Sequence, residues 1–242
     1  MEKLEHEHTA EAIADRIAAS NHNYIRDFIY GGIDGAVTTF AVVSGVSGAE
    51  LSPTIVLILG FANLAADGFS MAASNYLGTR AEQEDYRRIE KIEYRHIEVA
   101  PEGEREEVRQ IYREKGFEGD ELEKAVDLIT ADKDRWVKTM LADEYGLAAE
   151  VRSPWYAAIA TFSAFVVCGL IPLLPYLFGS ASSFLVSCIM TGATFFLIGS
   201  LKSRWSTSGW FRSGLETLFV GTLAAGLAYA VGVLLKGLAV SI

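Results

Sequence analysis

The 242-residue sequence has few cysteines and fewer basic than acidic side chains. Its two cysteines, Cys168 and Cys188, cannot build a disulfide framework, and both lie in apolar stretches where cysteine acts as a small core residue. With 21 Lys and Arg against 31 Asp and Glu, the formal net charge is −10. This balance argues against nucleic acid as a partner, because phosphates require a basic surface. The composition therefore excludes a disulfide-rich secreted scaffold and disfavours a nucleic-acid-binding protein.

Charge is also missing from long stretches of the chain, because most of it is collected in one segment. Residues 81–153 carry 13 Lys and Arg and 21 Asp and Glu. Five other stretches are apolar and nearly or wholly uncharged: 28–49, 53–77, 154–178, 181–201 and 217–235. Each is long enough to cross a bilayer as a helix, which takes about 20 residues. A large soluble helical protein with buried hairpins is the alternative, but five such runs argue against it.

The sequence therefore predicts an all-α membrane protein with five transmembrane helices and a helical insert between the second and third. The expected parts are an N-terminal amphipathic segment (1–27), spans one and two (28–80), an acidic helical domain (81–153) and spans three to five (154–242). Residues 1–20 are polar and charged, so no signal peptide is expected. A short apolar stripe there predicts a helix on the membrane surface, with a solvated tail as the alternative. The stripe consists of Ala10, Ile13, Ala14 and Ile17.

The basic residues predict which side of the membrane each loop occupies. Lys and Arg precede the first run, fill the insert and recur between the fourth and fifth runs. The connections after the first and third runs, residues 50–52 and 179–180, contain none. The positive-inside rule then places the N-terminus and the insert in the cytoplasm and the C-terminus on the opposite side. The expected location is the inner or plasma membrane.

Polar side chains inside the runs indicate a pathway for a cation. A carboxylate in hydrocarbon costs at least about 2.5–3.5 kcal/mol and normally faces a cavity or an ion route. Asp34 lies in the first run; Asn63, Asp67 and Met71 follow one another at intervals of four residues in the second and share one helical face. The added thioether favours a softer transition metal over Mg²⁺ or Ca²⁺. The alternative is that Asn63 joins helices and Met71 faces lipid.

The third apolar run contains two prolines, in the segment "GLIPLLPY". Pro172 and Pro175 must interrupt regular helical hydrogen bonding there. In the last run, Gly221 and Ala225 fit a small-xxx-small pattern, which is common where membrane helices pack closely.

The insert is predicted to be helical, with breaks at residues 101–103 and 116–119. Asp120, followed three residues later by Glu123, is typical of a helix N-cap and its capping partner. Carboxylates recur at helical spacing along the insert, a pattern from which helical bundles build metal sites. Any one of these glutamates is also compatible with a solvated surface. The carboxylate pairs at this spacing are Glu90/Glu93 and Glu104/Glu107, and Met140 is followed one turn later by Glu144.

The spacing of Glu93 and His96 matches the Glu-x-x-His motif of di-iron carboxylate proteins. Such a centre needs two copies, and no remaining histidine supplies the second. A ferritin-like oxidase is therefore disfavoured.

The chain resembles the vacuolar iron transporter family, and in size its prokaryotic-type members. The resemblance covers residues 24–236 and rests on "YGGIDGAVTTFAVVSGVSGA", "GFANLAADGFSMAASNYL", the acidic insert, "GLIPLLPY" and the Gly- and Ala-rich last run. It implies a five-span homodimer in the lipid bilayer that moves Fe²⁺ or Mn²⁺ out of the cytosol in exchange for protons. It also implies no enzymatic activity, no permanently bound cofactor and an insert that binds metal in the cytoplasm.

Carried over residue by residue, the resemblance assigns the pathway aspartate to Asp34 and the pathway methionine to Met71. The glutamate of plant members falls on Asn63, so we expect Asp67, one turn further along, to supply the charge. In the insert one expected glutamate falls on His96, and a second methionine position is Leu141. The remaining family ligands match Glu93, Glu104, Glu107, Met140 and Glu144.

We therefore expect a divalent transition-metal transporter directed from the cytoplasm to the opposite side. The alternative is a membrane-anchored metal sensor or storage protein, in which the insert binds metal and nothing crosses. Asp34 and Asp67 favour transport, because a sensor needs no carboxylates within the membrane. A carrier of another substrate, such as an organic cation, is disfavoured by the glutamates of the insert.

Overall fold

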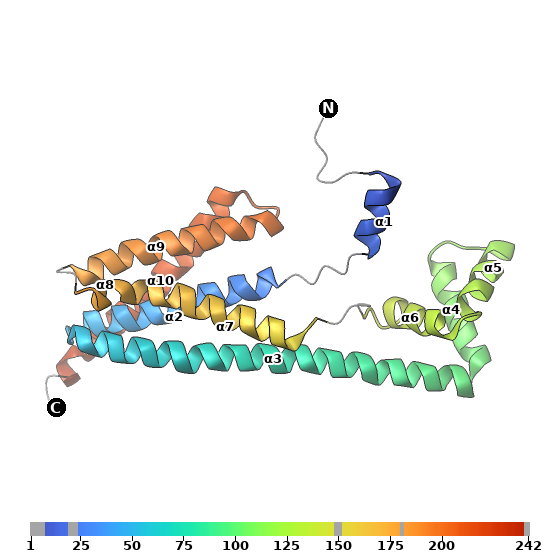
Figure 1. The fold of residues 1–242 in the computed structure, drawn as a ribbon, viewed down its shortest axis with the longest axis horizontal. Helices are drawn as coiled ribbons and strands as arrows, with labels where there is room; N and C mark the ends of the chain where they lie inside the picture. Colours follow the sequence, from blue (N-terminus) through green and yellow to red (C-terminus); the bar gives the residue numbers. More distant parts are fainter. Residues whose placement is uncertain (1–7, 19–23, 148–151, 180–181, 240–242) are drawn as a thin grey trace. The chain divides into compact units, whose positions relative to one another are not determined.

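The computed structural model describes residues 8–18, 24–147, 152–179 and 182–239, and the regular elements in these residues are all helical (Figure 1). The longer helices are α1 (Ala10–Ala18), α2 (Ile25–Gly48), α3 (Pro53–Val99), α4 (Pro101–Glu114), α5 (Gly119–Thr130), α6 (Lys133–Asp143), α7 (Pro154–Leu170), α9 (Ser183–Lys202) and α10 (Trp210–Ala239). The shorter ones are the 3₁₀ helices η1 (Ile171–Leu173) and η2 (Ser203–Trp205) and the single turn α8 (Leu174–Leu177).

The chain divides into two compact units. The five-span unit comprises Asn23–Leu77 and Pro154–Ile242, and the insert unit comprises Met1–His22 and Gly78–Ser153. Five helices are long and apolar enough to cross a membrane: α2, the apolar part of α3, α7 continued by α8, α9 continued by η2, and α10. The predicted all-α fold with five spans, and with short helices between the second and third, is confirmed.

Helix α2 lies at the centre of the five-span unit, where it packs against α7, α9 and α10. Glycines allow this close approach: a Cβ on Gly35 would lie 2.3 Å from the Phe165 carbonyl oxygen of α7. On the other side of α2, a Cβ on Gly232 of α10 would lie 2.1 Å from the carbonyl oxygen of Gly45. Small residues at these crossings let two membrane helices approach backbone to backbone.

The predicted interruption of the third span is confirmed. Helix α7 ends at Leu170, and the chain continues through η1 into the single turn α8. Serines of α9 satisfy carbonyl groups in this region: Ser187 Oγ donates to the Pro172 oxygen at 2.8 Å, and Ser183 Oγ donates to the Pro175 oxygen at 3.2 Å. Hydrogen bonds within the protein are needed for such carbonyl groups in a bilayer, because the hydrocarbon core contains no water that could donate to them.

Gly221 in the last span lies against α9, as the small-xxx-small pattern suggested. A Cβ at this position would lie 2.2 Å from the ring of Phe195. Helix α10 begins at Trp210, seven residues before the apolar run. It therefore includes Arg212 and Glu216, whose side chains form an ion pair at 3.1 Å.

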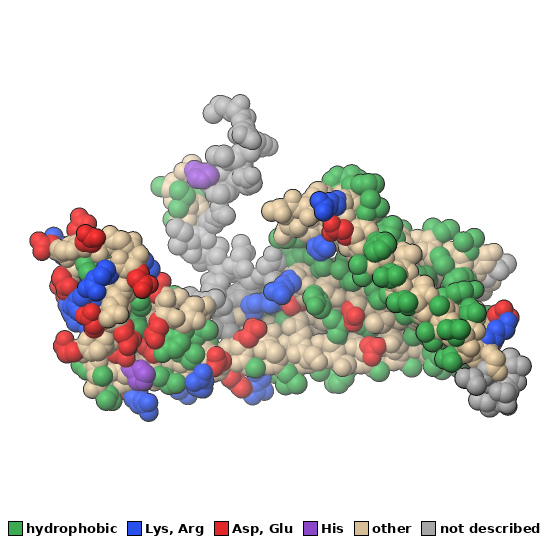
Figure 2. Space-filling view, turned by 180° about the vertical axis from the view of Figure 1, so that it is seen from behind, with side chains coloured by type: hydrophobic (Ala, Val, Ile, Leu, Met, Phe, Trp, Pro, Cys, Tyr) green, Lys and Arg blue, Asp and Glu red, His purple; other side chains and the backbone are tan. Residues whose placement is uncertain are grey.

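The insert unit has a hydrophobic core of its own, built from the second half of α3 together with α4, α5 and α6. Val108, Val126 and Val137 are completely buried there. In the space-filling view of Figure 2, acidic and basic side chains crowd the insert unit, whereas hydrophobic side chains are widespread on the five-span unit. A core under a charged surface is what a helical domain in water requires.

Two local predictions in the insert need correction. The break predicted at residues 101–103 is present but lies at Ala100, because Pro101 begins α4, where its missing N–H is tolerated. Asp120 is not an N-cap: Glu118, in extended backbone, precedes α5, and Asp120 lies within the first turn. The side-chain cap that forms is at Asp132, which accepts a hydrogen bond from the Arg135 backbone N–H at 2.8 Å and begins α6.

The predicted boundary at residue 80 falls inside a helix. Helix α3 runs for 47 residues and is continuous from the second span into the insert (Figure 1). Within the N-terminal segment, α1 confirms a helix, and its Ile13 is 40% exposed. Residues 1–7 and 19–23 of that segment lie outside the described part of the chain.

Candidate functional site

The turn between α3 and α4 brings two glutamates and a histidine together. Glu93 and His96 lie one turn apart near the end of α3, and Glu104 lies in the first turn of α4. The His96 Nδ1 atom is 3.3 Å from Glu104 Oε1 and 3.8 Å from Glu93 Oε1. One ligand atom of each residue lies within 4.8 Å of the other two, a spacing that suits a single metal ion.

The two glutamates of this cluster are deeply buried. Glu93 is 0% and Glu104 is 6% exposed, although carboxylates are rarely buried without partners. Tyr145 donates its hydroxyl to Glu93 Oε1 at 3.0 Å, but within the described residues the Oε2 atoms of both glutamates have no hydrogen-bond partner. Two buried, unpartnered carboxylate oxygens beside an imidazole fit a divalent cation of the Fe²⁺ or Mn²⁺ type.

The electrostatics of the cluster point in the same direction. Burial raises the pKa of Glu104 to about 7, with further contributions from the negative charges of Glu107, Glu93 and Glu144. Burial, followed by the charges of Glu107 and Glu93, also raises the pKa of Glu144. Four carboxylates therefore repel one another around one place, and a cation bound there would relieve that repulsion.

The other predicted insert ligands lie around this cluster in different ways. Glu107, one turn after Glu104, is exposed, as is Glu144. Met140 is completely buried in the core of the insert unit, next to Leu141. His96 is 40% exposed at its side chain, so the cluster is open to solvent on the histidine side. The structure thus brings Glu93, His96 and Glu104 within contact distance and surrounds them with the others; their role as ligands stays a prediction.

In the five-span unit, α2 and α3 present polar groups to each other along an antiparallel seam. Asn63 Nδ2 donates to Thr38 Oγ1 at 3.3 Å and lies 3.5 Å from Thr39 Oγ1, so Asn63 links the two helices. Further along the same two helices, α2 carries Asp34 and α3 carries Asp67. Asp34 is half-buried and Asp67 is exposed on this single chain.

Met71, the last predicted pathway residue, is partly buried and packs against the hydrophobic core of the five-span unit. It lies one turn beyond Asp67 on α3, toward the insert. The structure therefore places Asp34, Asn63, Asp67 and Met71 along one stretch of α2 and α3, and their participation in transport remains a prediction.

A buried polar network at the end of this seam was not predicted. Asp27 is 6% exposed in the first turn of α2, and Asn75 Nδ2 of α3 donates to its Oδ1 at 2.9 Å. The same amide nitrogen lies 2.7 Å from Thr161 Oγ1 of α7, so three helices meet in this network. The sequence held a signal for it: Asp27 precedes Asp34 by seven residues and so shares its helical face.

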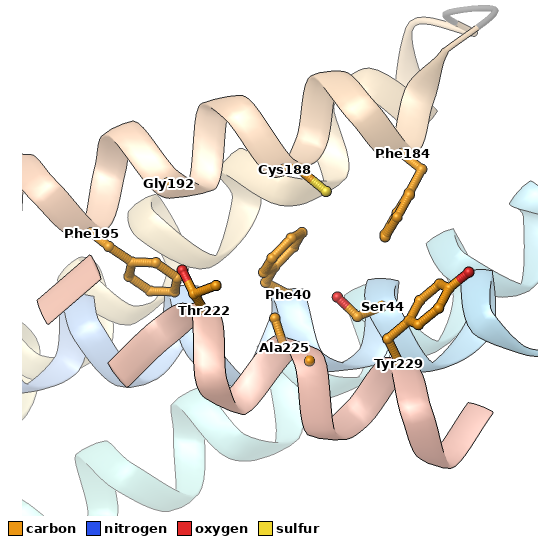
Figure 3. Close-up of a pocket in the computed structure, with 10 residues that line it drawn as sticks. Phe40, Ser44, Phe184, Cys188, Gly192, Phe195, Thr222, Ala225 and Tyr229 are labelled. Atoms are coloured by element: carbon orange, nitrogen blue, oxygen red, sulfur yellow. The ribbon is translucent and has the colours of Figure 1, made fainter. Parts of the chain in front are cut away.

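A separate cavity of about 310 Å³ lies between α2, α9 and α10 (Figure 3). Its walls are mostly apolar, with the rings of Phe40, Phe184 and Tyr229 and the thiol of Cys188 directed toward it. No carboxylate lines it, so it lacks the ionised oxygen ligands that divalent cations such as Mg²⁺ and Ca²⁺ usually take. Among these features, the α2–α3 seam and the Glu93–His96–Glu104 cluster are the places where cation ligands gather.

Comparison with known proteins gives consistent matches along the chain. Residues 25–233 match the sequence model of the VIT family. The chain is 34% identical over 210 residues to "Vacuolar iron transporter 1" of Arabidopsis thaliana, covering 85% of this chain and 83% of that protein. It is 32% identical over 229 residues to "Vacuolar iron transporter" of Toxoplasma gondii, which covers 90% of this chain and 76% of that protein. It is also 32% identical over 232 residues to the Plasmodium falciparum protein of the same name, which covers 89% of this chain and 85% of that protein. These relatives are eukaryotic, so the prokaryotic type stays a prediction.

Proposed function

The chain belongs to the VIT family, and from this premise we propose that it carries Fe²⁺ or Mn²⁺ across a membrane and out of the cytoplasm. It is an integral membrane protein from a family of transporters, not of enzymes. The transported ion is substrate rather than a resident cofactor. The proposal places the insert and the N-terminus in the cytoplasm, the C-terminus on the opposite side and the protein in the inner or plasma membrane.

The observation that carries this proposal is the seam between α2 and α3. Asp34 of α2 and Asp67 of α3 place a carboxylate on each of two neighbouring helices, within segments apolar enough to cross a membrane. Such groups are costly in a bilayer unless they bind a cation or a proton, so they mark an ion route. Met71, one turn along α3, adds a thioether, a soft ligand that favours a transition metal such as Fe²⁺ over Mg²⁺.

Exchange for protons follows from the same chemistry. A carboxylate that binds a metal ion must first lose its proton, and a proton that returns displaces the metal. Asp34 and Asp67 are the groups we propose to alternate between the two, because Asn63, where plant members have a glutamate, cannot ionise. Proton flow toward the cytoplasm then accompanies metal flow away from it.

We also propose that two copies of the chain form the pathway. In the single chain only 22% of the most apolar stretch of α3 is buried, and Asp67 is exposed on this helix. A carboxylate facing lipid would be unfavourable, whereas a second copy packed against α3 would enclose it. The homodimer implied by the family resemblance supplies such a copy.

The cluster in the insert unit has a distinct role in this proposal. Glu93, His96 and Glu104 would capture metal from the cytoplasm and raise its local concentration near the membrane. The alternative function, a membrane-anchored sensor or store, uses this cluster alone. It leaves the carboxylates of the seam without a purpose, which is why transport is preferred.

The test is metal uptake by proteoliposomes that contain the purified protein, an internal metal indicator and a pH dye. Asp34→Asn should abolish metal flux and the coupled pH change while the protein stays folded. The matched control is Glu216→Gln, which removes a carboxylate of α10 that is paired with Arg212. Normal metal flux in Asp34→Asn would contradict the proposed pathway. Metal binding by the wild-type protein without metal flux would favour the sensor function.

A further inference from the structure

A groove in the five-span unit combines apolar walls with two cations. It lies between the first turns of α2 and the end of α9, where η2 follows, and has a volume of about 430 Å³. Its lining residues are Ile25, Arg26, Ile29, Tyr30, Lys202 and Trp205. None of them is acidic, so the groove presents positive charge above a hydrophobic wall.

The two cations of the groove have no acidic partner among the residues that the structure describes. Within residues 8–18, 24–147, 152–179 and 182–239, neither Arg26 nor Lys202 lies within ion-pair distance of a carboxylate. The neighbouring Asp27 is buried and engages Asn75 of α3. The contrast with Arg212 and Lys236 is direct, because each of those has a glutamate partner. The groove is thus a place where an anion would be complementary in charge.

The position of these cations along the helices matches the headgroup level of a bilayer. Arg26 lies in the first turn of α2 and Lys202 is the last residue of α9, so both lie at one end of their spans. Trp205 is 50% and Tyr30 is 67% exposed. Indole and phenol rings are enriched at this level, because they have an apolar body and a polar edge.

We propose that this groove binds an anionic phospholipid. Arg26 and Lys202 contact the lipid phosphate, Trp205 lies at the level of the glycerol, and an acyl chain follows Ile25 and Ile29 into the bilayer. Basic pockets between membrane helices are suited to such headgroups, and each nearby cation contributes about 1 kcal/mol to the attraction. A zwitterionic lipid brings its own cation and gains less. The inference concerns lipid and is independent of which ion the protein carries.

The experiment uses the full chain, purified in neutral detergent and stripped of lipid. Phosphatidylglycerol and phosphatidylcholine with identical acyl chains are titrated separately, and bound lipid is counted by native mass spectrometry. We expect saturable binding of one phosphatidylglycerol per chain and markedly weaker binding of phosphatidylcholine. Soluble glycerol 3-phosphate, which lacks the chains, should not compete at equal concentration. Equal binding of the two lipids, or full competition by glycerol 3-phosphate, would overturn the proposal.

Variants locate the site. Arg26→Gln/Lys202→Gln should weaken phosphatidylglycerol binding roughly thirtyfold, or five- to sixfold for each cation. Arg204→Gln/Arg212→Gln removes the same charge from side chains that do not line the groove and should retain binding. The exchange Arg26→Lys/Lys202→Arg keeps both charges and should also bind, which separates loss of charge from damage to the fold. Equal affinity in the glutamine pair and its matched control would refute the site.

Discussion

At the scale of single residues, the most informative groups are buried carboxylates that lack enough partners. Glu93 and Glu104 are almost fully enclosed, and each has one oxygen without a hydrogen bond in the described structure. A protein that only needed a stable core would replace such groups with apolar ones, because a buried unpaired charge is strongly unfavourable. Their presence is understandable if a cation completes them, as the proposed metal capture requires.

The pKa of Glu104 leads to a prediction about pH. Burial and neighbouring carboxylates raise this pKa to about 7, so the group is largely ionised at pH 8 and largely protonated at pH 6. Metal must displace that proton, and affinity should fall about tenfold per pH unit below 7. Calorimetric titration of the full protein with Mn²⁺ at both pH values measures this loss.

The variant Glu104→Gln should bind Mn²⁺ weakly and with a shallower pH dependence. Glu121→Gln, which changes an exposed glutamate on α5, should keep the wild-type slope. If Glu104→Gln and wild type lose affinity equally between pH 8 and pH 6, the titrating group is not Glu104.

At the scale of helices, the central position of α2 depends on its glycines. Gly35 meets the backbone of α7, Gly48 meets the Tyr229 carbonyl oxygen of α10, and neither contact leaves room for a side chain. Membrane helices gain little from hydrophobic burial against one another, so close packing of this kind is a main source of their association. The α2–α3 seam also depends on it, because α7 and α10 hold α2 in place.

We therefore expect Gly35→Ala to destabilise the protein by about 1–3 kcal/mol, since the new methyl group would overlap the Phe165 carbonyl group. Thermal unfolding of the purified protein in detergent should show a midpoint lowered by several degrees. Gly226→Ala on α10 is the control, because a Cβ there meets nothing within 4 Å. Equal midpoints for the two variants would show that the α2–α7 approach is looser than the structure indicates.

At the scale of the whole molecule, one helix belongs to both compact units. Helix α3 carries Asn63, Asp67 and Met71 in the five-span unit and Glu93 and His96 in the insert unit. The two groups of candidate ligands are thus joined by continuous helix rather than by a loop. The proposed capture of metal and its proposed transport can nevertheless be separated by experiment, since they use different residues.

If the insert supplies metal to the pathway, Glu104→Gln/Glu107→Gln should slow transport when metal is scarce and matter little when it is abundant. Initial rates of Fe²⁺ or Mn²⁺ uptake across a concentration series would show a raised half-saturation concentration with an unchanged maximum. Asp120→Asn/Glu121→Gln removes the same charge from α5 and should leave both values unaltered. A reduced maximum in the first variant would instead indicate a direct role in the transport step.

Topology provides the second prediction at this scale. In a background with Cys168 and Cys188 replaced by alanine, Glu118→Cys in the insert and Ser52→Cys between α2 and α3 should react from opposite sides of the membrane. Both positions are exposed in the structure. A thiol reagent that cannot cross the bilayer, added from outside to intact cells, should label Glu118→Cys only after the membrane has been permeabilised. Labelling of both cysteines from one side would contradict the proposed orientation.

Much of the fold was predictable because its signals are local in the chain. Five apolar runs specify five spans, since the length of a run and the thickness of the bilayer determine whether it crosses. Pro172 and Pro175 specify the interruption of the third span, because the lack of an N–H acts within one turn. The acidic residues of the insert likewise indicated a charged helical domain and named the glutamates that line its cluster.

Only the tertiary structure determined which residues far apart in sequence lie close together. Spacing along α3 could not show that Glu104 comes back to His96, that Asn75 reaches Asp27, or that Arg26 and Lys202 share one groove. Helical periodicity specifies which face a side chain occupies, but not which other helix covers that face. Within the five-span unit that choice depends on the close packing of glycines in α2 against α7 and α10, and within the insert unit it depends on the burial of apolar side chains such as Val108 and Val126. Both are properties of a folded unit and not of any one segment.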